Sequence, residues 1–298
     1  MYRGLEEFVA ETVSFVDDGL RSGEPVLVAV SRPKIGLLRE ALGDRSHDVT
    51  FTDMAELGRN PARIIPAWRR FVGDHAEHAP GLRGVGEPIW PQRSAAELAE
   101  SQRNEALLNL ALADASGLQL LCPYDLDALE AAVVDEARRS HPFVRAAGSA
   151  ASSPTYGADD STPPYELPLP EPRSPSATFD FDAHSLGHVR ELVEQAAAAA
   201  RLGPARTADL VLAVNEVAAN SIRHGGGRGA LRTWVSHHEG VVCEVRDGGH
   251  IDDPLVGRRE RPPGVVDGRG LWIANQLCDL VEVRTSPDGS IVRLHVGA

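Results

Sequence analysis

The chain has 298 residues, 42% of them hydrophobic, and a formal net charge of −13. This length predicts about two globular domains. The acidic balance argues against direct DNA binding, which needs clustered lysine and arginine. The three cysteines lack CxxC spacing, which predicts neither a disulfide framework nor a zinc site. We recognise neither a signal peptide nor an apolar run that could span a bilayer, so we expect a cytoplasmic protein without a membrane partner.

Residues 1–146 carry alternating strand and helix patterns. A continuous apolar run at 25–30 is typical of a strand that is buried on both faces. Further strand patterns lie at 48–51, 82–87 and 118–123, and helical patterns lie at 5–19, 34–42, 61–78, 94–113 and 126–138. Strands that alternate with helices predict an α/β domain, in which a parallel sheet is covered on both faces.

Ligands usually bind such a sheet at the carboxyl ends of its strands. The candidates for a sensor pocket, at the strand ends and on the long helix, are Glu87, Trp90, Glu105, Asn109, Tyr124 and Asp125. The alternative is a network of polar turn residues that stabilises the fold. For Cys122 we expect a small buried hydrophobe rather than a reactive thiol. The GxxxxGK(S/T) phosphate loop is missing from the chain, so we expect no nucleotide hydrolysis in this domain.

Five segments of this domain occur in a characteristic order, namely EPVLVAV, DMAELGRNPARI, GEPIW, NEALLN and LCPYD. In this order they resemble the MEDS sensory family, and the resemblance covers most of residues 1–145. It implies a RecA-like parallel sheet with a degenerate phosphate loop. It also implies that this domain senses a small molecule.

Residues 147–176 are rich in proline, serine and acidic residues and show no apolar periodicity. Such a segment buries too little surface to offset the entropy of ordering the chain. We therefore expect an extended, mobile linker, which leaves residues 177–298 as a second domain.

The second domain contains a helix pattern over Leu210 to Gly225. Within it, Glu216, Asn220 and His224 follow one another at intervals of four residues, which places their side chains on one face. Amide and carboxylate oxygens are ligands that Mg²⁺ takes, and a glutamate one turn away could orient or deprotonate a hydroxyl. The alternative is the solvated face of an amphipathic helix.

Around this helix the pattern predicts strands at 178–181, 230–237, 241–246, 280–285 and 290–296 and helices at 185–201 and 271–278. The third of these strands ends in Asp247, followed by Gly248 and Gly249. The carboxylate can accept from an exocyclic amine of adenine, and glycines let the ring approach the backbone. A simple turn is the alternative.

The long polar segment at 250–267 is typical of a lid. Its Arg258, Arg259 and Arg261 could reach phosphate oxygens, although a solvated loop is an equal alternative. Gly268 and Gly270 then open a helix, where exposed N–H groups and the helix dipole favour an anion.

The order of these motifs resembles the GHKL ATPase family over essentially all of residues 177–298. The resemblance implies an α+β Bergerat sandwich that binds ATP and Mg²⁺. In that fold Asn220 would hold Mg²⁺, Asp247 the adenine, Gly268 and Gly270 the phosphates, and Glu216 would be the catalytic base. The remaining nucleotide contacts that we expect are His224, Gly249, Leu271 and Ser290, which stands where small members of the family usually have threonine.

The compact domain looks like the anti-sigma factor kinases. This likeness implies a homodimer that binds a sigma factor and phosphorylates a serine or threonine of a STAS-domain anti-anti-sigma partner. One alternative is a module that binds the sigma factor in a nucleotide-dependent way without transferring phosphate. Another is an orphan sensor histidine kinase, but the proline-rich linker lies where its dimerisation helices would be. We expect His184 and His188 to be helix-surface residues rather than phosphate acceptors.

Overall fold

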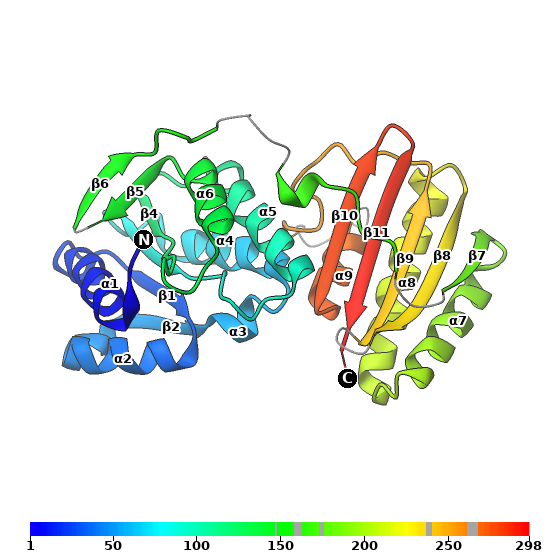
Figure 1. Cartoon of the computed structure of the whole chain (residues 1–298), viewed down its shortest axis with the longest axis horizontal. Helices are drawn as coiled ribbons and strands as arrows, with labels where there is room; N and C mark the ends of the chain where they lie inside the picture. Colours follow the sequence, from blue (N-terminus) through cyan, green and yellow to red (C-terminus); the bar gives the residue numbers. More distant parts are fainter. Residues whose placement is uncertain (147, 158–162, 173–175, 237–239, 261–267, 298) are drawn as a thin grey trace. The chain divides into compact units, whose positions relative to one another are not determined.

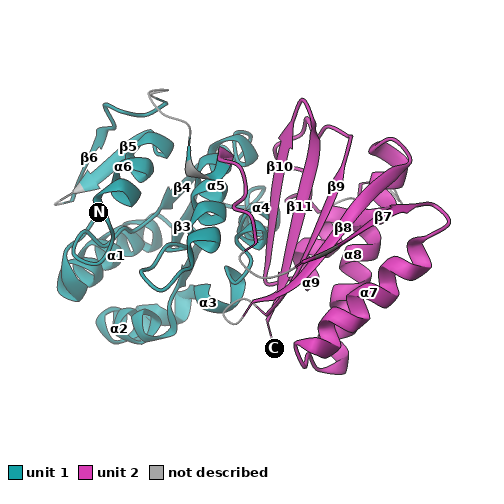
Figure 2. Ribbon diagram, turned by 45° about the vertical axis from the view of Figure 1, so that its right-hand side comes forward, with its two compact units in different colours: residues 1–165 teal, residues 166–298 magenta. Residues whose placement is uncertain are grey.

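A computed structural model describes residues 1–146, 148–157, 163–172, 176–236, 240–260 and 268–297. The chain forms two compact units (Figures 1 and 2), residues 1–165 (unit 1) and residues 166–298 (unit 2). Each unit has its own sheet and its own hydrophobic core.

Unit 1 contains the parallel sheet that the sequence predicts. Its strands are β1 (Val26–Val30), β2 (Val49–Asp53), β3 (Leu82–Gly86) and β4 (Leu118–Leu121), in the order β2-β1-β3-β4. All neighbouring pairs are parallel. The four predicted strands are confirmed. They could be predicted because a short apolar run between two helices is typical of a buried strand.

Helices cover both faces of this sheet. On one face Val28 and Val85 pack with Phe8 and Leu38 in a single core cluster. On the other face Gly84 lets Trp68 approach closely, since a Cβ on Gly84 would lie 2.6 Å from the indole. The helices of unit 1 are α1 (Gly4–Arg21), α2 (Arg32–Leu42), α3 (Met54–Leu57), α4 (Ile64–His75), α5 (Ala95–Ala111) and α6 (Ala131–Ser140), with 3₁₀ turns η1 (Gly43–Asp48) and η2 (Pro61–Arg63).

In unit 1, α6 is followed by a hairpin that was not predicted from the sequence. Strand β5 (Phe143–Ala146) pairs antiparallel with β6 (Ser149–Ser152). Gly148 has φ of 75°, a left-handed conformation that glycine adopts without strain. The Glu11 carboxylate accepts from the Gly148 N–H at 2.8 Å and lies 3.3 Å from Arg145 Nε. The expectation of an irregular segment from residue 147 onward is therefore wrong for β6, which a distant carboxylate on α1 holds in place.

Unit 2 is an antiparallel sheet with helices on one face (Figure 1). Its strands are β7 (Ala177–Asp182), β8 (Arg228–Ser236), β9 (Gly240–Asp247), β10 (Leu280–Ser286) and β11 (Gly289–Val296), in the order β10-β11-β9-β8-β7. Its helices are α7 (Leu186–Ala199), α8 (Pro204–His224) and α9 (Gly270–Leu277). Buried side chains such as Val193, Leu210, Val245 and Leu294 form the core between these layers. Residue 237, the last of the predicted strand at 230–237, lies outside the described residues.

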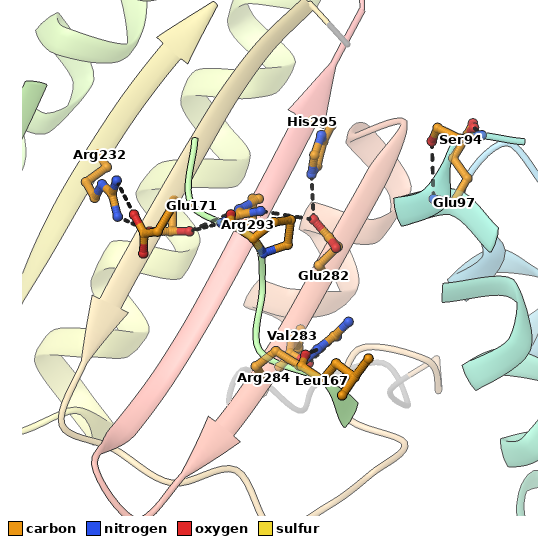
Figure 3. Close-up of polar contacts among 12 residues, drawn as sticks. Ser94, Glu97, Leu167, Glu171, Arg232, Glu282, Val283, Arg284, Arg293 and His295 are labelled. Atoms are coloured by element: carbon orange, nitrogen blue, oxygen red, sulfur yellow. Dashed lines mark hydrogen bonds and ion pairs between the residues drawn. The ribbon is translucent and has the colours of Figure 1, made fainter. Parts of the chain in front are cut away.

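The face of this sheet opposite the helices carries a row of alternating charges. Arg232, Glu244, Arg293 and Glu282 are direct neighbours across β8, β9, β11 and β10. Opposite charges on adjacent strands attract, and Arg293 Nη2 lies 2.6 Å from the Glu244 carboxylate. Glu244 is fully buried and Glu282 and Arg293 are nearly so. His295 extends the row, with its Nε2 2.9 Å from Glu282 (Figure 3).

Residues 166–172, which we call the strap, belong to unit 2 and lie against the same face (Figure 3). Arg284 donates to the Leu167 carbonyl at 3.0 Å and Arg293 to the Pro170 carbonyl at 2.9 Å. Glu171 lies 2.9 Å from Arg232. This part of the predicted linker is therefore held by side chains of the sheet. It follows the 3₁₀ turn η3 (Pro164–Glu166).

Candidate nucleotide site and the sensor-pocket candidates

Helix α8 presents the polar face that the sequence predicts. Leu210, Val214 and Val217 are buried in the core of unit 2. Glu216 and Asn220 lie half-buried on a different side of the helix, whereas His224 is exposed at its last residue. The Asn220 side-chain oxygen accepts a hydrogen bond from Arg223 at 2.9 Å. A carboxylate and an amide oxygen thus stand one turn apart, partly shielded from solvent.

The start of α9 lies directly against this face. A Cβ on Gly270 would be 2.6 Å from the Asn220 amide nitrogen and 3.2 Å from the Glu216 carbonyl oxygen. Only glycine allows so close an approach. Gly268, two residues earlier, has φ of 80°. Leu271 is buried and belongs to the hydrophobic core. The first N–H groups of α9 therefore lie beside Asn220, where they can bind an anion.

Asp247 lies at the end of β9 against the end of α8. Its carboxylate accepts from the Ser221 hydroxyl at 2.6 Å and from the Gly249 N–H at 2.8 Å. A Cβ on Gly225 would lie 2.5 Å from the Asp247 carboxyl carbon. Each carboxylate oxygen has two lone pairs, so the carboxylate can still accept from a ligand. Sequence reasoning missed Ser221, although it directly follows Asn220.

Ser290, near the start of β11, contacts the backbone that follows Asp247. It pairs with Asp247 across the β9–β11 ladder, and its hydroxyl donates to the Gly249 carbonyl at 2.9 Å. Thr285, which the sequence analysis did not select, lies 3.2 Å from the Ser290 hydroxyl and 3.0 Å from His250 Nδ1. The end of α8, the end of β9, the start of α9 and the start of β11 therefore meet in one place, which we call the corner of unit 2.

The described part of the predicted lid is not a free loop. Leu255 is buried, and the Gly257 carbonyl accepts from the Asn275 side chain at 2.9 Å. Arg258 is also buried, which does not fit the alternative of a solvated side chain, and its contact with phosphate stays a prediction. Arg259 is exposed, and Arg261 lies outside the described residues.

In unit 1, Glu87 belongs to a buried polar network around the first residues of the chain. Lys34 donates to both carboxylate oxygens of Glu87, at 2.6 and 2.7 Å, and the Tyr2 hydroxyl donates to one of them at 2.7 Å. Burial raises the pKa of Glu87, with Lys34 opposing the shift. Asp125 bridges to Tyr2 through the backbone. The network joins three segments of the fold. This arrangement fits the alternative of polar turn residues that stabilise the fold.

Trp90 lies apart from that network. The guanidinium of Arg93 stacks 3.8 Å from the centroid of its ring. Arg93 also donates to the Pro88 and Gly58 carbonyls, at 2.6 and 2.7 Å. This contact fixes the turn after β3.

The other three sensor-pocket candidates, Glu105, Asn109 and Tyr124, line one cavity of about 500 Å³. The Tyr124 hydroxyl donates to Glu105 Oε2 at 3.1 Å. Cys122 and His141, which the sequence analysis did not include, line the same cavity. Burial, followed by the charge of Glu105, raises the pKa of the Cys122 thiol and that of Tyr124. The six candidates thus separate into a structural network, a stacked turn and a cavity.

Comparisons with known proteins match the two units to two families. Residues 1–142 match the model of the MEDS domain, described as the methanogen/methylotroph, DcmR sensory domain. Residues 179–296 match the model of the histidine kinase-like ATPase domain. No curated protein sequence gave a significant match.

Among solved structures, a crystal structure of the RsbU and RsbW domains of a Mycobacterium tuberculosis protein is similar over 42% of this chain, at 18% identity and a TM-score of 0.32. This chain spans about a third (32%) of the length of that structure.

Proposed function

We propose that this chain, which joins a MEDS sensory domain to a histidine kinase-like ATPase domain, is an ATP-dependent regulator of the anti-sigma factor type. In this proposal unit 2 phosphorylates a serine or threonine of a STAS-domain anti-anti-sigma partner, and a small-molecule signal at unit 1 controls it. Both sequence resemblances are confirmed by the family matches. The activity and the partners are proposed.

The observation that carries the proposal is the contact of the start of α9 with Asn220 and Glu216. The cradle beside Asn220 is open only because residue 270 has no side chain. It combines backbone donors for phosphate with a hard oxygen donor for Mg²⁺, so the residues fit a magnesium–nucleotide complex. When bound, that complex supplies the transferable phosphoryl group and neutralises its charge.

The other residues have distinct proposed roles. Asp247 accepts from the exocyclic amine of adenine, while Ser221 and Gly249 hold its carboxylate in place. Ser290 fixes the backbone of Gly249, next to the adenine. His224 and Leu271 border the site, Leu271 through its backbone N–H, because its side chain is in the core.

Glu216 is the proposed general base. The acceptor hydroxyl forms a bond to the γ-phosphorus while the bond from that phosphorus to the bridging oxygen of ADP breaks. The hydroxyl proton passes to the Glu216 carboxylate. Positioning and charge neutralisation supply most of the rate enhancement of such a transfer, so a half-buried carboxylate one turn from Asn220 on the same helix suffices for this role.

Three further parts of the proposal concern the whole chain. We propose a cytoplasmic homodimer that binds a sigma factor and, given its net charge of −13, makes no direct contact with DNA. None of the described helices is long and apolar enough to cross a membrane.

The degenerate phosphate loop of unit 1 stays a prediction. Lys34, the only lysine in the chain, follows β1, where such a loop would lie, and its ammonium donates a hydrogen bond to Glu87.

A label-transfer assay tests the proposal. The full chain is mixed with γ-labelled ATP, Mg²⁺ and a purified STAS-domain protein from the same genome. We expect acid-stable label on the STAS-domain protein. Because a general base contributes about 10²–10⁴-fold, Glu216→Gln should lower the transfer rate by that factor while ATP binding remains. Glu191→Gln, on the exposed side of α7, is the matched control and should transfer at the wild-type rate.

The other outcomes identify the alternatives. ATP binding without any transferred label would identify a nucleotide-dependent module that binds a sigma factor. Acid-labile label on the chain itself would identify a histidine kinase.

A further inference from the structure

Three side chains that the proposed function does not use meet at the cavity of unit 1. Glu105 comes from α5, Cys122 follows β4, and His141 follows the last residue of α6, neighbouring elements of unit 1 (Figure 1). One ligand atom from each, a carboxylate oxygen, the thiol sulfur and an imidazole nitrogen, lies within 4.8 Å of the other two. Side chains separated by up to 36 positions in the sequence are therefore close enough to share one ion.

The distance between two of these atoms matches metal coordination. Glu105 Oε2 and His141 Nε2 are 3.3 Å apart. Two tetrahedral ligands that each lie about 2.0–2.1 Å from a zinc ion are separated by about 3.3 Å. The carboxylate and the imidazole thus already have the spacing of two ligands of one ion.

The imidazole of His141 is oriented for this role. Its Nδ1 lies 2.8 Å from the Ala137 carbonyl oxygen, which can only accept a hydrogen bond, so Nδ1 carries the proton. Nε2, which pairs with the Glu105 carboxylate at 3.3 Å, is then the nitrogen at which a metal ion would replace a proton. Metal-binding histidines characteristically donate the other N–H to a carbonyl or carboxylate in this way. Tyr124 similarly holds the Glu105 carboxylate through Oε2.

A second, independent observation is an unsatisfied oxygen. Glu105 is 2% exposed, and its Oε1 has no hydrogen-bond partner among the described residues. Buried carboxylate oxygens without a partner are costly and rare in folded proteins. A cation at the cluster would satisfy this oxygen, and the adjoining cavity of about 500 Å³ has room for the ion and a further ligand.

We propose that Glu105, Cys122 and His141 bind a divalent transition-metal ion, with Zn²⁺ as the best fit, and that one coordination position faces the cavity. A thiolate, an imidazole and a carboxylate are all zinc ligands, whereas Mg²⁺ and Ca²⁺ take oxygen ligands. Three protein ligands with one open position are typical of zinc sites that bind an external ligand. The thiol proton leaves to solvent when the metal binds. This inference goes beyond the proposed function and revises the expectation that the chain has no zinc site.

Metal binding by the full chain tests the proposal. Protein stripped with a chelator is loaded with Co²⁺ or Zn²⁺, and bound metal is measured by mass spectrometry after gel filtration. We expect one metal ion per chain and, with Co²⁺, a thiolate-to-metal charge-transfer band. Cys122→Ser, His141→Gln and Glu105→Gln should each weaken binding by about tenfold or more. His75→Gln is the matched control, because His75 Nδ1 also lies near a backbone carbonyl, at 2.9 Å from Phe71, but His75 is not in the cluster.

A measurement on the wild-type chain keeps the test valid if a variant fails to fold. Cys243 and Cys278 have no exposed surface, whereas Cys122 is partly accessible. Iodoacetamide should therefore label Cys122 of the native metal-free protein before Cys243 and Cys278, slowly because burial raises the pKa of the Cys122 thiol, and Zn²⁺ should slow the reaction further. A missing charge-transfer band, an alkylation rate that Zn²⁺ leaves unchanged, or metal binding that survives all three substitutions would overturn the proposal.

Discussion

Replacing the buried carboxylate of Glu244 should destabilise unit 2 far more than replacing an exposed carboxylate that shares two of its three arginine partners. Glu244 is fully buried, and it lies 2.6 Å from Arg293, 2.7 Å from Arg246 and 3.4 Å from Arg232. Glu244→Gln keeps the shape but removes the charge. Among the described residues, the nearest carboxylate that remains for the buried guanidinium of Arg293 is then Glu282, at 3.9 Å.

Breaking a buried ion pair on one side costs roughly 3–5 kcal/mol. Because Arg293 keeps its bond to the Pro170 carbonyl and its more distant pairing with Glu282, we expect the lower end, about 3 kcal/mol. Glu171 also contacts Arg232 and Arg246, but its side chain is 70% exposed. Glu171→Gln should therefore leave the stability unchanged, because solvent screens exposed pairs.

Hydrogen exchange followed by mass spectrometry assigns the effect to unit 2, since β9 and β11 give peptides of their own. A loss of about 3 kcal/mol should speed exchange of these strands about 10²-fold, while the strands of unit 1 exchange as before. An acceleration below about fivefold, which is less than about 1 kcal/mol, would refute the reasoning, as would an equal effect of Glu171→Gln.

Two further predictions concern unit 2. Gly270→Ala forces the Asn220 amide to move away and narrows the cradle for phosphate, so the affinity for ATP measured by calorimetry with Mg²⁺ should fall roughly tenfold. For Glu282, burial alone would raise the pKa, but the hydrogen bond and charge of His295 and the charges of Arg293 and Arg284 together outweigh it and lower the pKa. The stabilisation is therefore present above the ordinary value of 4.5 and is lost as the pH falls through the lower native pKa. Urea unfolding of Glu282→Gln should show a flatter acid limb than the wild type.

The strands, and the place where the ends of α8 and β9 meet the starts of α9 and β11, could be predicted because their signals are local. Short apolar runs between helices identify β1 to β4, and the order of the Glu216–Asn220 pair, Asp247 and Gly270 identifies the corner in unit 2. Local signals place boundaries less well. The helix pattern at 126–138 starts early, because a turn in which Asp125 accepts from the Asp127 and Leu129 N–H groups precedes α6.

The parts that could not be predicted are held by residues distant in the sequence. The β5–β6 hairpin depends on Glu11, and the strap depends on Arg284 and Arg293. Neither segment has apolar periodicity, so composition alone suggested a mobile linker. The closeness of Cys122 and His141 was missed for the same reason. Metal-ligand spacing in a sequence is recognisable when ligands share one turn, not when helix α6 separates them.

The sensor-pocket candidates of unit 1 have different surroundings in the structure. The position at strand ends indicated Glu87 and Asp125, which the fold uses to fasten Tyr2 and Lys34 near β1. Helix spacing indicated Glu105 and Asn109, and these do line the cavity. Both ligand-binding residues and turn-stabilising residues occur at strand ends. Their contacts and burial distinguish them, and these are known only from the structure.

Calorimetric titration of the full chain with ATP and Mg²⁺ tests the central claim most directly. We expect one ATP bound per chain and, for Asp247→Asn, an affinity about tenfold or more lower, since a hydrogen bond to a charged acceptor contributes about 1.5–3 kcal/mol. Asparagine retains an oxygen for the Ser221 hydroxyl, so the corner should stay folded. Asp288→Asn, in the exposed β10–β11 turn, should bind ATP like the wild type. Wild-type protein that binds no ATP, or an Asp247→Asn variant that binds it undiminished, would contradict the account.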